Sequence, residues 1–388
     1  MTAERASALR PARVIKREPM RRRRLLQLAL PPWVLGRPPK AGRISRYEIF
    51  PVRVPFAERV REAWIRSWER QKRDQIDFTM QLVRLHTDEG LSGIGESKMP
   101  REETEAALKK MVGRPAEEFD GDDSIRGILI AVYDLMGKAA GKPVAALLNP
   151  GYRRRITQTW WSQCFPPELM ASEARLGASL GYRVHKVKAR PWEDPVQQAA
   201  AMCAVVPKEF KIWVDANSSW ETVERTLDLT RKLAEFDNYF AIESPLARAN
   251  IDGYRRLKGR LPLKISEHVD AFTQSGELEI WTREKLLDAW IAGAPRLGRY
   301  VADLSAKAQA AGVPVWIEHS IDNGIAQVFQ AHQTAAYAGL QYAISITHVL
   351  EDDLMKEPFA MREGYYSIPN QPGLGVTIDE EAVHRYAL

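Results

Sequence analysis

The chain has 388 residues, which suggests roughly two to three domains and is long enough to bury a core without a disulfide or a structural metal. Its 45% hydrophobic and 27% charged residues are typical of a globular protein and exclude a wholly disordered chain. The two cysteines, Cys164 and Cys203, exclude a disulfide scaffold and a four-cysteine zinc site. No run of about 18 apolar residues predicts a membrane span.

The net charge of +6 is concentrated at the N-terminus. Residues 1–45 contain twelve of the 56 Lys and Arg residues and two of the 50 acidic residues. The other 343 residues therefore carry 44 basic and 48 acidic side chains. A mildly acidic body argues against nucleic-acid binding, so neither a nucleic-acid nor a membrane partner is expected.

Residues 1–43 are rich in Arg and Pro and lack a helical or strand period, which predicts a basic, disordered extension. Arg22-Arg23-Arg24 and the apolar residues after it resemble a twin-arginine export signal. Pro31-Pro32 interrupts that apolar stretch, and no small-residue cleavage site follows. A cytoplasmic location is therefore expected, with twin-arginine export as the alternative.

The next segment, residues 44–150, is predicted to be an α+β domain. Apolar residues alternate over 44–54, 77–86 and 92–97, with a turn at 87–90, which predicts an antiparallel meander. Apolar residues at helical spacing between about 102 and 148 predict helices.

From residue 157 the chain alternates between short apolar strands and helical segments, a pattern typical of a (β/α) barrel. The eight predicted strands span residues 157–165, 184–188, 211–215, 239–243, 263–267, 287–292, 313–319 and 341–348. A doubly wound open sheet is the alternative, but no G-x-G-x-x-G motif follows the first strand.

Three consecutive predicted strands end in a carboxylate: Asp215, Glu243 and Glu267. Neighbouring strands lie about 4.8 Å apart, so these groups could converge on one point at the C-terminal end of the barrel. Three like charges repel unless a cation lies between them, and hard oxygen ligands suit Mg²⁺. The alternative is a set of ordinary solvent-facing charges, which three successive strands in register disfavour.

Candidate bases lie on two other strands. Lys186 and Lys188 are two residues apart and should face the same side of the second strand. Two ammonium groups this close lower each other's pKa, which leaves one of them able to act as a base. A solvated face of an edge strand is the alternative, but a barrel has no edge. His319 ends the seventh strand across from Lys188 and would suit proton transfer on a second face of the substrate.

The motifs together resemble the enolase superfamily, in its mandelate racemase and muconate-lactonizing branch. The resemblance covers residues 44 to about 384. It rests on nine segments in order: Arg46–Phe56, the G-x-G-E motif at 93–97, Ala131–Leu148, Arg154-Arg155-Ile156, Lys186-Val187-Lys188, Asp215-Ala216-Asn217, Glu243-Ser244-Pro245, Ser266-Glu267-His268 and 372–376.

This resemblance implies a modified TIM barrel, (β/α)7β, over residues 151–359. An α+β capping domain, residues 44–150, would be completed by residues 360–388. The family removes the proton α to a carboxylate, and the chemistry requires a metal because the enolate's second charge must be stabilised as it forms. One Mg²⁺ held by Asp215, Glu243 and Glu267 is implied. A small-molecule carboxylate substrate is also implied, and a homo-oligomer is expected by analogy.

The resemblance also implies roles for single residues. Lys188 would be the base, Lys186 would hold the substrate carboxylate, and Asn217 would contact substrate. Glu351 would be the eighth-strand acid that protonates or hydrogen-bonds a carboxylate oxygen. Substrate range would be set by the capping-domain loop after Phe56, which carries Trp64, Arg66 and Trp68, although a plain amphipathic helix is the alternative for that loop.

The sixth strand departs from the family pattern. Gly293 fills the position where the family carries Asp or Lys, and Asp288 lies near the strand's start, at the barrel floor. His319 therefore lacks an evident partner to orient it. Glu318 and Asp322 are sequence neighbours of His319, but strand alternation predicts that Glu318 faces away. The identity of the second acid or base is thus open.

The favoured function is dehydration of a hydroxy or sugar acid, with Lys188 as base and His319 as general acid. A racemase or epimerase of a 2-hydroxy acid or an amino-acid derivative is the first alternative. Without His319, Lys188 alone would permit a one-base reaction such as syn elimination. A degenerate barrel that binds the metal without turnover is the remaining alternative.

Overall fold

The computed structural model describes residues 39–71, 78–272, 274, 276–293, 297–318, 320–344 and 346–388, apart from the side chain of Trp68. The predictions for the twin-arginine segment and for His319 lie outside the described residues, as does most of the predicted disordered extension, 1–43. Its last residues are described and ordered: Ala41 is buried and Arg43 forms a β-bridge with Pro115, so the prediction of disorder up to residue 43 is wrong at this end. Within the described ranges, no helix is both long and apolar enough to cross a membrane.

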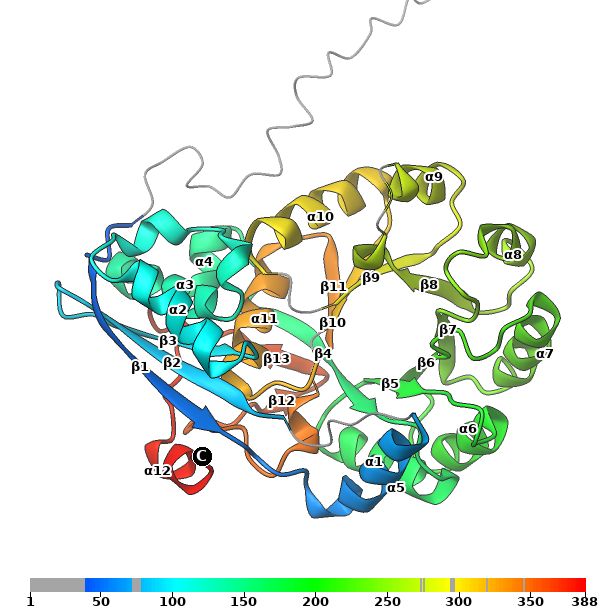
Figure 1. The fold of residues 1–388 in the computed structure, drawn as a ribbon. Coiled ribbons are helices and arrows are strands. Elements are labelled where there is room, and N and C mark those ends of the chain that lie inside the picture. The colour runs from blue at the N-terminus through cyan, green and yellow to red at the C-terminus, as the bar shows by residue number, and fades with distance from the viewer. Residues whose placement is uncertain are drawn as a thin grey trace, which may run out of the picture.

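The first part of the chain forms a three-stranded antiparallel sheet covered by helices (Figure 1). The sheet has the order β1 (Ile44–Val52), β2 (Met80–Thr87), β3 (Ser92–Ser97). Its helices are α2 (Arg101–Met111), α3 (Ile128–Ala140) and α4 (Val144–Leu148), while α1 (Glu58–Arg70) lies below the barrel in the view of Figure 1. The three strands lie where the alternation of apolar residues predicts them.

The second part is a closed barrel of eight parallel strands, because the last strand pairs with the first. Its strands are β4 (Arg155–Ser162), β5 (Val184–Lys188), β6 (Lys211–Asp215), β7 (Tyr239–Glu243), β8 (Lys264–His268), β9 (Ala289–Ala292), β10 (Val315–Glu318) and β11 (Leu340–Ile344). The helices between them are α5 (Pro167–Ser179), α6 (Pro195–Cys203), α7 (Val223–Leu233), α8 (Ile251–Leu257), α9 (Glu277–Arg283), α10 (Gly298–Ala311) and α11 (Gly324–Ala336). The predicted barrel with a capping α+β unit is confirmed. The C-terminal ends of the strands are called the mouth below.

The C-terminal segment first adds a hairpin to the barrel and then reaches back to the first part of the chain. The short strands β12 (Met361–Arg362) and β13 (Tyr365–Ser367) form a hairpin that pairs antiparallel with β4. Helix α12 (Glu380–Arg385) follows, and the backbone N–H of Leu388 donates to the carbonyl of Pro51 at 3.0 Å. The C-terminal residues therefore lie against the end of β1.

Large aromatic side chains fill the floor of the barrel. The ring centroids of Trp213 and Trp316 are 4.5 Å apart, and Phe240 and Tyr342 pack against the same two rings. Because side chains alternate along a strand, the residue two positions after Trp316 also faces the interior. That residue is Glu318, so the prediction that Glu318 faces away is wrong.

Candidate active site

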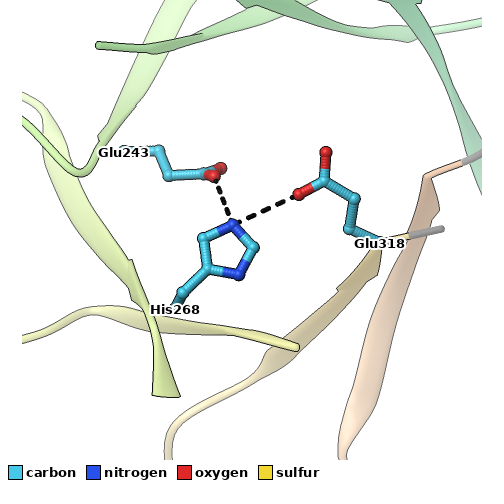
Figure 2. A group of neighbouring side chains, drawn as sticks. All are labelled: Glu243, His268 and Glu318. Atoms are coloured by element: carbon cyan, nitrogen blue, oxygen red, sulfur yellow. Dashed lines mark ion pairs between the residues drawn. The ribbon is translucent and has the colours of Figure 1, made fainter. Parts of the chain in front are cut away.

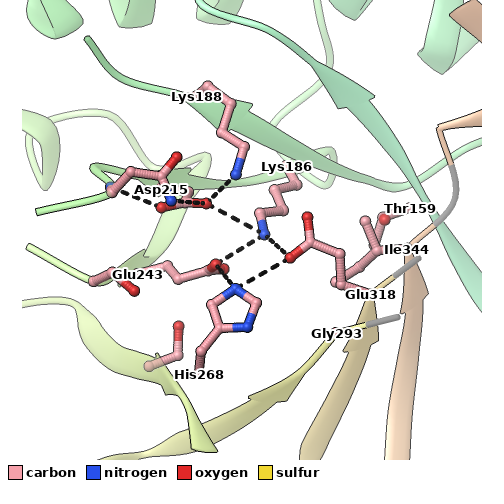
Figure 3. A network of polar contacts seen from close by, with 12 residues as sticks. Thr159, Lys186, Lys188, Asp215, Glu243, His268, Gly293, Glu318 and Ile344 are labelled. Carbon is pink, nitrogen blue, oxygen red and sulfur yellow. Dashed lines mark hydrogen bonds and ion pairs between the residues drawn. The ribbon is translucent and has the colours of Figure 1, made fainter. Parts of the chain in front are cut away.

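Of the two lysines of β5, Lys186 lies at the centre of a buried charge network and Lys188 at its edge (Figure 3). The Lys186 Nζ atom is 2.9 Å from Glu243 Oε1, 2.9 Å from Glu318 Oε2 and 3.5 Å from Asp215 Oδ2. Lys188 forms an ion pair with the same oxygen of Asp215. Four barrel strands therefore contribute charges to this one cluster.

The network keeps Lys186 protonated. Burial alone would lower the pKa of this lysine, but Glu243, Glu318 and Asp215 outweigh burial and raise it above its ordinary value. Lys186 is therefore a permanent cation. That state suits the binding of an anionic oxygen and does not suit proton transfer.

The same contacts keep two of the acids ionised. Burial would raise the pKa of Asp215, but Lys188, Lys186 and Arg190 lower it well below its usual range. Burial is also the largest single effect on Glu318 and raises its pKa, but Lys186, Lys188 and His268 together outweigh it, so the pKa of Glu318 is lowered. Both side chains are therefore carboxylates at neutral pH.

Glu267 is held away from this cluster. Its Oε2 accepts a hydrogen bond from Tyr254 OH at 2.5 Å, and its Oε1 accepts from Ser244 Oγ at 2.7 Å and from the backbone N–H of His268 at 2.8 Å. Among the described residues, one group of three possible metal ligands has its ligand atoms within 4.8 Å of one another: Glu243, His268 and Glu318 (Figure 2). This group shares only Glu243 with the ligand set predicted from the sequence.

The donor chemistry at the mouth fits a hard divalent cation. Asp215 and Glu243 are buried, lie opposite each other in the register of adjacent strands, and carry oxygen donors of the kind that Mg²⁺ prefers. Glu267 and Glu318 are two further carboxylates close by. For Glu267 to become a ligand, its side chain would have to turn away from Tyr254 and Ser244.

His268 projects into the network from the end of β8. Its Nε2 lies 3.2 Å from Glu243 Oε1 and 3.3 Å from Glu318 Oε2, and its Nδ1 lies 3.1 Å from Asp270 Oδ1. Burial lowers the pKa of this imidazole, but hydrogen bonds to the three carboxylates raise it well above 6.5 overall. His268 belongs to the Ser266-Glu267-His268 motif, but the sequence alone predicts no role for it. Its position directly after a strand-end carboxylate is the signal that could have singled it out.

A cavity of about 670 Å³ opens beside the network. It is lined by polar residues from the mouth and by an apolar wall, among them Lys188, Arg190, Asn217, His268, Gly293, Glu318, Trp64, Phe78, Trp161, Ile321 and Ile346. Trp64 and Asn217, both predicted to contact substrate, line it. The side chain of Trp68 and the whole of His319 lie outside the described residues.

Comparison with known proteins identifies the family. The family model described as "Enolase C-terminal domain-like" matches residues 169–382, more than half of the chain. The chain belongs to the enolase superfamily. Its relatives include dehydratases, racemases and cycloisomerases. The chain is therefore an enzyme of this superfamily, whose members are lyases or isomerases.

Two relatives and one solved structure show how far the similarity extends. Arabinonate dehydratase of Saccharolobus solfataricus is 28% identical over 68% of this chain and 71% of its own. Chloromuconate cycloisomerase of Cupriavidus pinatubonensis is 26% identical over 79% of this chain and 90% of its own. The crystal structure of N-succinyl Arg/Lys racemase from Bacillus cereus has a TM-score of 0.70 at 20% identity, covering 89% of this chain and 98% of that one. The last comparison supports the enolase-superfamily fold alone.

One residue that the superfamily pattern predicts at the mouth lies elsewhere. Strand β11 ends at Ile344, earlier than the predicted strand of residues 341–348, and a 3-10 turn spans Thr347–Val349. After this turn, Glu351 forms an ion pair with Arg61 of α1. Glu351 lines a separate cavity of about 710 Å³ beside His348, so the structure does not bring it to the lysines.

Proposed function

We propose that this enzyme removes the proton α to the carboxylate of a hydroxy or sugar acid and eliminates the β-hydroxyl group as water. One observation carries the proposal: Lys188 lines the cavity while Lys186, two residues earlier, is fixed below it as a buried cation among three carboxylates. An amine that lines the cavity beside a fixed positive charge suits proton removal next to a carboxylate.

The proposal includes Mg²⁺, the metal usual in the superfamily. Asp215 and Glu243 would hold it, with Glu267 as the third ligand once its side chain turns from Tyr254. Bound there, the cation would supply Lewis-acid stabilisation of the charge that develops on the substrate carboxylate.

The chain's own residues would divide the remaining work. Lys188 takes the α-proton, and Lys186 binds one oxygen of the substrate carboxylate. Asn217 lines the cavity and would contact a substrate hydroxyl. It is held in place because Arg190 Nη2 donates to its Oδ1 at 2.6 Å and its backbone N–H donates to Asp215 Oδ1 at 2.9 Å. Trp161 and Trp64, whose rings lie 5.4 Å apart, form a wall that excludes water.

The elimination breaks two bonds of the substrate. The α C–H bond breaks with its proton on Lys188, the electron pair forms the double bond of the enol, and the Cβ–O bond breaks. The departing hydroxide takes one proton and leaves as water. The sequence predicts His319 as the donor of that proton, and His268, which lines the cavity, is the second candidate.

A racemase or epimerase is the second candidate, and the apolar wall of the cavity favours it. Phe78, Ile321 and Ile346 stand beside the two tryptophans. An acid sugar offers these side chains little apolar surface, whereas an amino-acid derivative with an apolar group would bury it there. The proton chemistry at Lys188 is the same for both candidates.

The test is solvent exchange. The protein is incubated with Mg²⁺ in D₂O and a panel of aldonic, aldaric, 2-hydroxy and N-acylamino acids, and the products are followed by mass spectrometry and chiral chromatography. Loss of one water supports dehydration, and deuterium gain with the opposite stereoisomer supports racemisation. Retained Mg²⁺ binding with neither outcome across the panel would contradict both.

Lys188→Met is the informative variant, because it keeps the length of the side chain and removes the amine. Deuterium uptake should fall by at least about 10³-fold. Lys208→Met is the matched control, since Lys208 is 81% exposed and paired only with the exposed Asp237 among the described residues.

A further inference from the structure

The sixth barrel strand, β9, carries no acidic side chain at the mouth, yet the space beside it is occupied. Gly293 follows this strand and lines the cavity. A Cβ atom added to Gly293 would lie 3.1 Å from Asp270 Oδ2 and 3.7 Å from His268 Cε1. A carboxylate from another segment therefore stands where a side chain of the sixth strand would project.

Asp270 is held in this place from two sides. It lies in the 3-10 turn Val269–Ala271, directly after the fifth barrel strand β8. Its Oδ2 accepts a hydrogen bond from the backbone N–H of Gly293 at 2.8 Å, and its Oδ1 lies 3.1 Å from Nδ1 of His268. Its side chain is only 13% exposed. It links the backbone N–H of Gly293, which follows β9, to the imidazole of His268 at the end of β8.

The ring that Asp270 holds points into the mouth. Because Nδ1 of His268 faces Asp270, its Nε2 atom is directed toward the oxygens of Glu243 and Glu318. Figure 3 shows His268 and Lys188 on opposite sides of the network, with Lys186 between them. Both His268 and Lys188 line the same cavity, so a substrate there would lie between an amine and an imidazole.

We propose that Asp270 is a positioning residue that supplies, from the end of the fifth strand, the carboxylate missing from the sixth. It fixes His268 with Nε2 toward the substrate face opposite Lys188, and His268 is the group that contacts substrate on that face. This role rests on the proposed function. The competing explanation is that Asp270 only ties β8 to β9.

Isotope exchange separates these two explanations. The first step needs only Lys188, while completed turnover also needs the group on the second face. Asp270→Asn keeps the size of the side chain and changes what it offers to Nδ1. This variant should lower turnover at least about 100-fold more than it lowers deuterium uptake at the α-carbon, and His268→Asn should do the same. Equal losses of both rates, or no loss of either, would overturn the proposal.

A carboxylate swap tests the position directly. In the double variant D270G/G293D the acid moves from the fifth strand to the sixth, into space that the glycine at position 270 leaves open. The turnover rate of the double variant should be at least about tenfold higher than that of Asp270→Gly alone. Circular dichroism and the melting temperature check that each variant is folded. No recovery in a folded double variant counts against a positional role.

A third measurement needs no substrate. The ring ¹⁵N signals of the seven histidines are recorded, and His268 is assigned by its loss in His268→Asn. Asp270→Asn should shift the His268 signals while the other six stay in place. Unchanged His268 signals would overturn the positioning role, whatever the activity. A wild type that exchanges no acid of the panel would instead contradict the proposed function, and the ring signals would still decide whether Asp270 holds His268.

Discussion

Lys186 is the residue on which the charges at the barrel mouth depend. Its side chain is fully buried, and its Nζ atom contacts oxygens of Asp215, Glu243 and Glu318. Removing one member of a buried, hydrogen-bonded ion cluster leaves an uncompensated charge, which costs more than the cluster itself contributes. Each carboxylate around Lys186 should therefore matter for stability as well as for chemistry.

Glu318→Gln tests this dependence. The substitution removes a charge from a side chain that contacts both Lys186 and His268, so the free energy of unfolding should fall by about 3–5 kcal/mol. Urea unfolding followed by circular dichroism measures it. Glu62→Gln is the control, because Glu62 is 81% exposed in its pair with Arg66 and should change stability by less than about 0.5 kcal/mol. Equal effects of the two substitutions would show that the network adds no stability.

Metal binding tests the third ligand. If Glu267 joins Asp215 and Glu243 around the cation, Glu267→Gln should weaken Mn²⁺ binding at least about tenfold, as measured by electron paramagnetic resonance. Tyr254→Phe removes a hydroxyl that competes for Oε2 of Glu267, so it should not weaken binding. Wild-type affinity in Glu267→Gln would remove this residue from the ligand set.

At the residue scale, sequence reasoning succeeded where a strand determines the direction of a side chain. Asp215 and Glu243 end adjacent strands, and the structure places them opposite each other. The prediction that Glu318 faces away counts alternation from residue 319 as a strand position, but β10 ends at Glu318, and Trp316 two residues earlier shows which face is inward. Glu351 was placed at the mouth because the turn after Ile344 has no clear signal in the sequence.

At the scale of elements, the G-x-G segment shows why a short motif can be informative. Gly93 and Gly95 lie on one face of β3, against helix α3. A Cβ atom at Gly93 would lie 2.3 Å from the carbonyl oxygen of Ala131, and one at Gly95 would lie 2.9 Å from the same residue's nitrogen. Both glycines are therefore required for the helix backbone to approach the sheet. The motif was recognised from the sequence, but this physical reason needed the helix position.

Gly93→Ala should consequently separate α3 from β3. The clash is with backbone atoms, which cannot rotate away, so destabilisation by about 1–3 kcal/mol or more is expected. Thermal unfolding measures it. Gly151→Ala is the matched control, since its Cβ would meet only Asn149 Oδ1, at 3.4 Å. A melting temperature equal to that of the control would show that the helix can shift at little cost.

At the scale of the whole molecule, the order of strands and helices was predictable because each barrel strand is a short apolar run separated from the next by a helix. The contact between the two parts was not predictable, because it joins residues more than 200 positions apart. Glu96, at the end of the G-x-G-E motif, reaches from β3 to the start of α11. Its Oε1 accepts from the backbone N–H of Asn323 at 2.6 Å, and Oε2 accepts from Ala326 at 3.3 Å.

This contact should make stability depend on pH. Burial, followed by repulsion from Asp322, raises the pKa of Glu96 to about 8, although the two backbone N–H groups and Lys98 oppose the shift. The folded protein thus holds a proton that the unfolded chain releases near pH 4.5. The contribution of Glu96 is therefore complete below pH 4.5 and is lost progressively as the pH rises to 8.

Glu96→Gln keeps an acceptor for Asn323 and removes the titration. The free energy of unfolding of the variant minus that of wild type should therefore increase from pH 5 to pH 8.5, because only the wild type loses stability through Glu96. Urea unfolding at four pH values in this range measures the difference. The buried histidines His185, His332 and His348, whose pKa values are lowered by burial, are present in both proteins, so their effects cancel in the difference. A difference that stays constant across the range would show that Glu96 is ionised in the folded protein at pH 5, and that the contact between the capping unit and the barrel is an ordinary ionic helix cap.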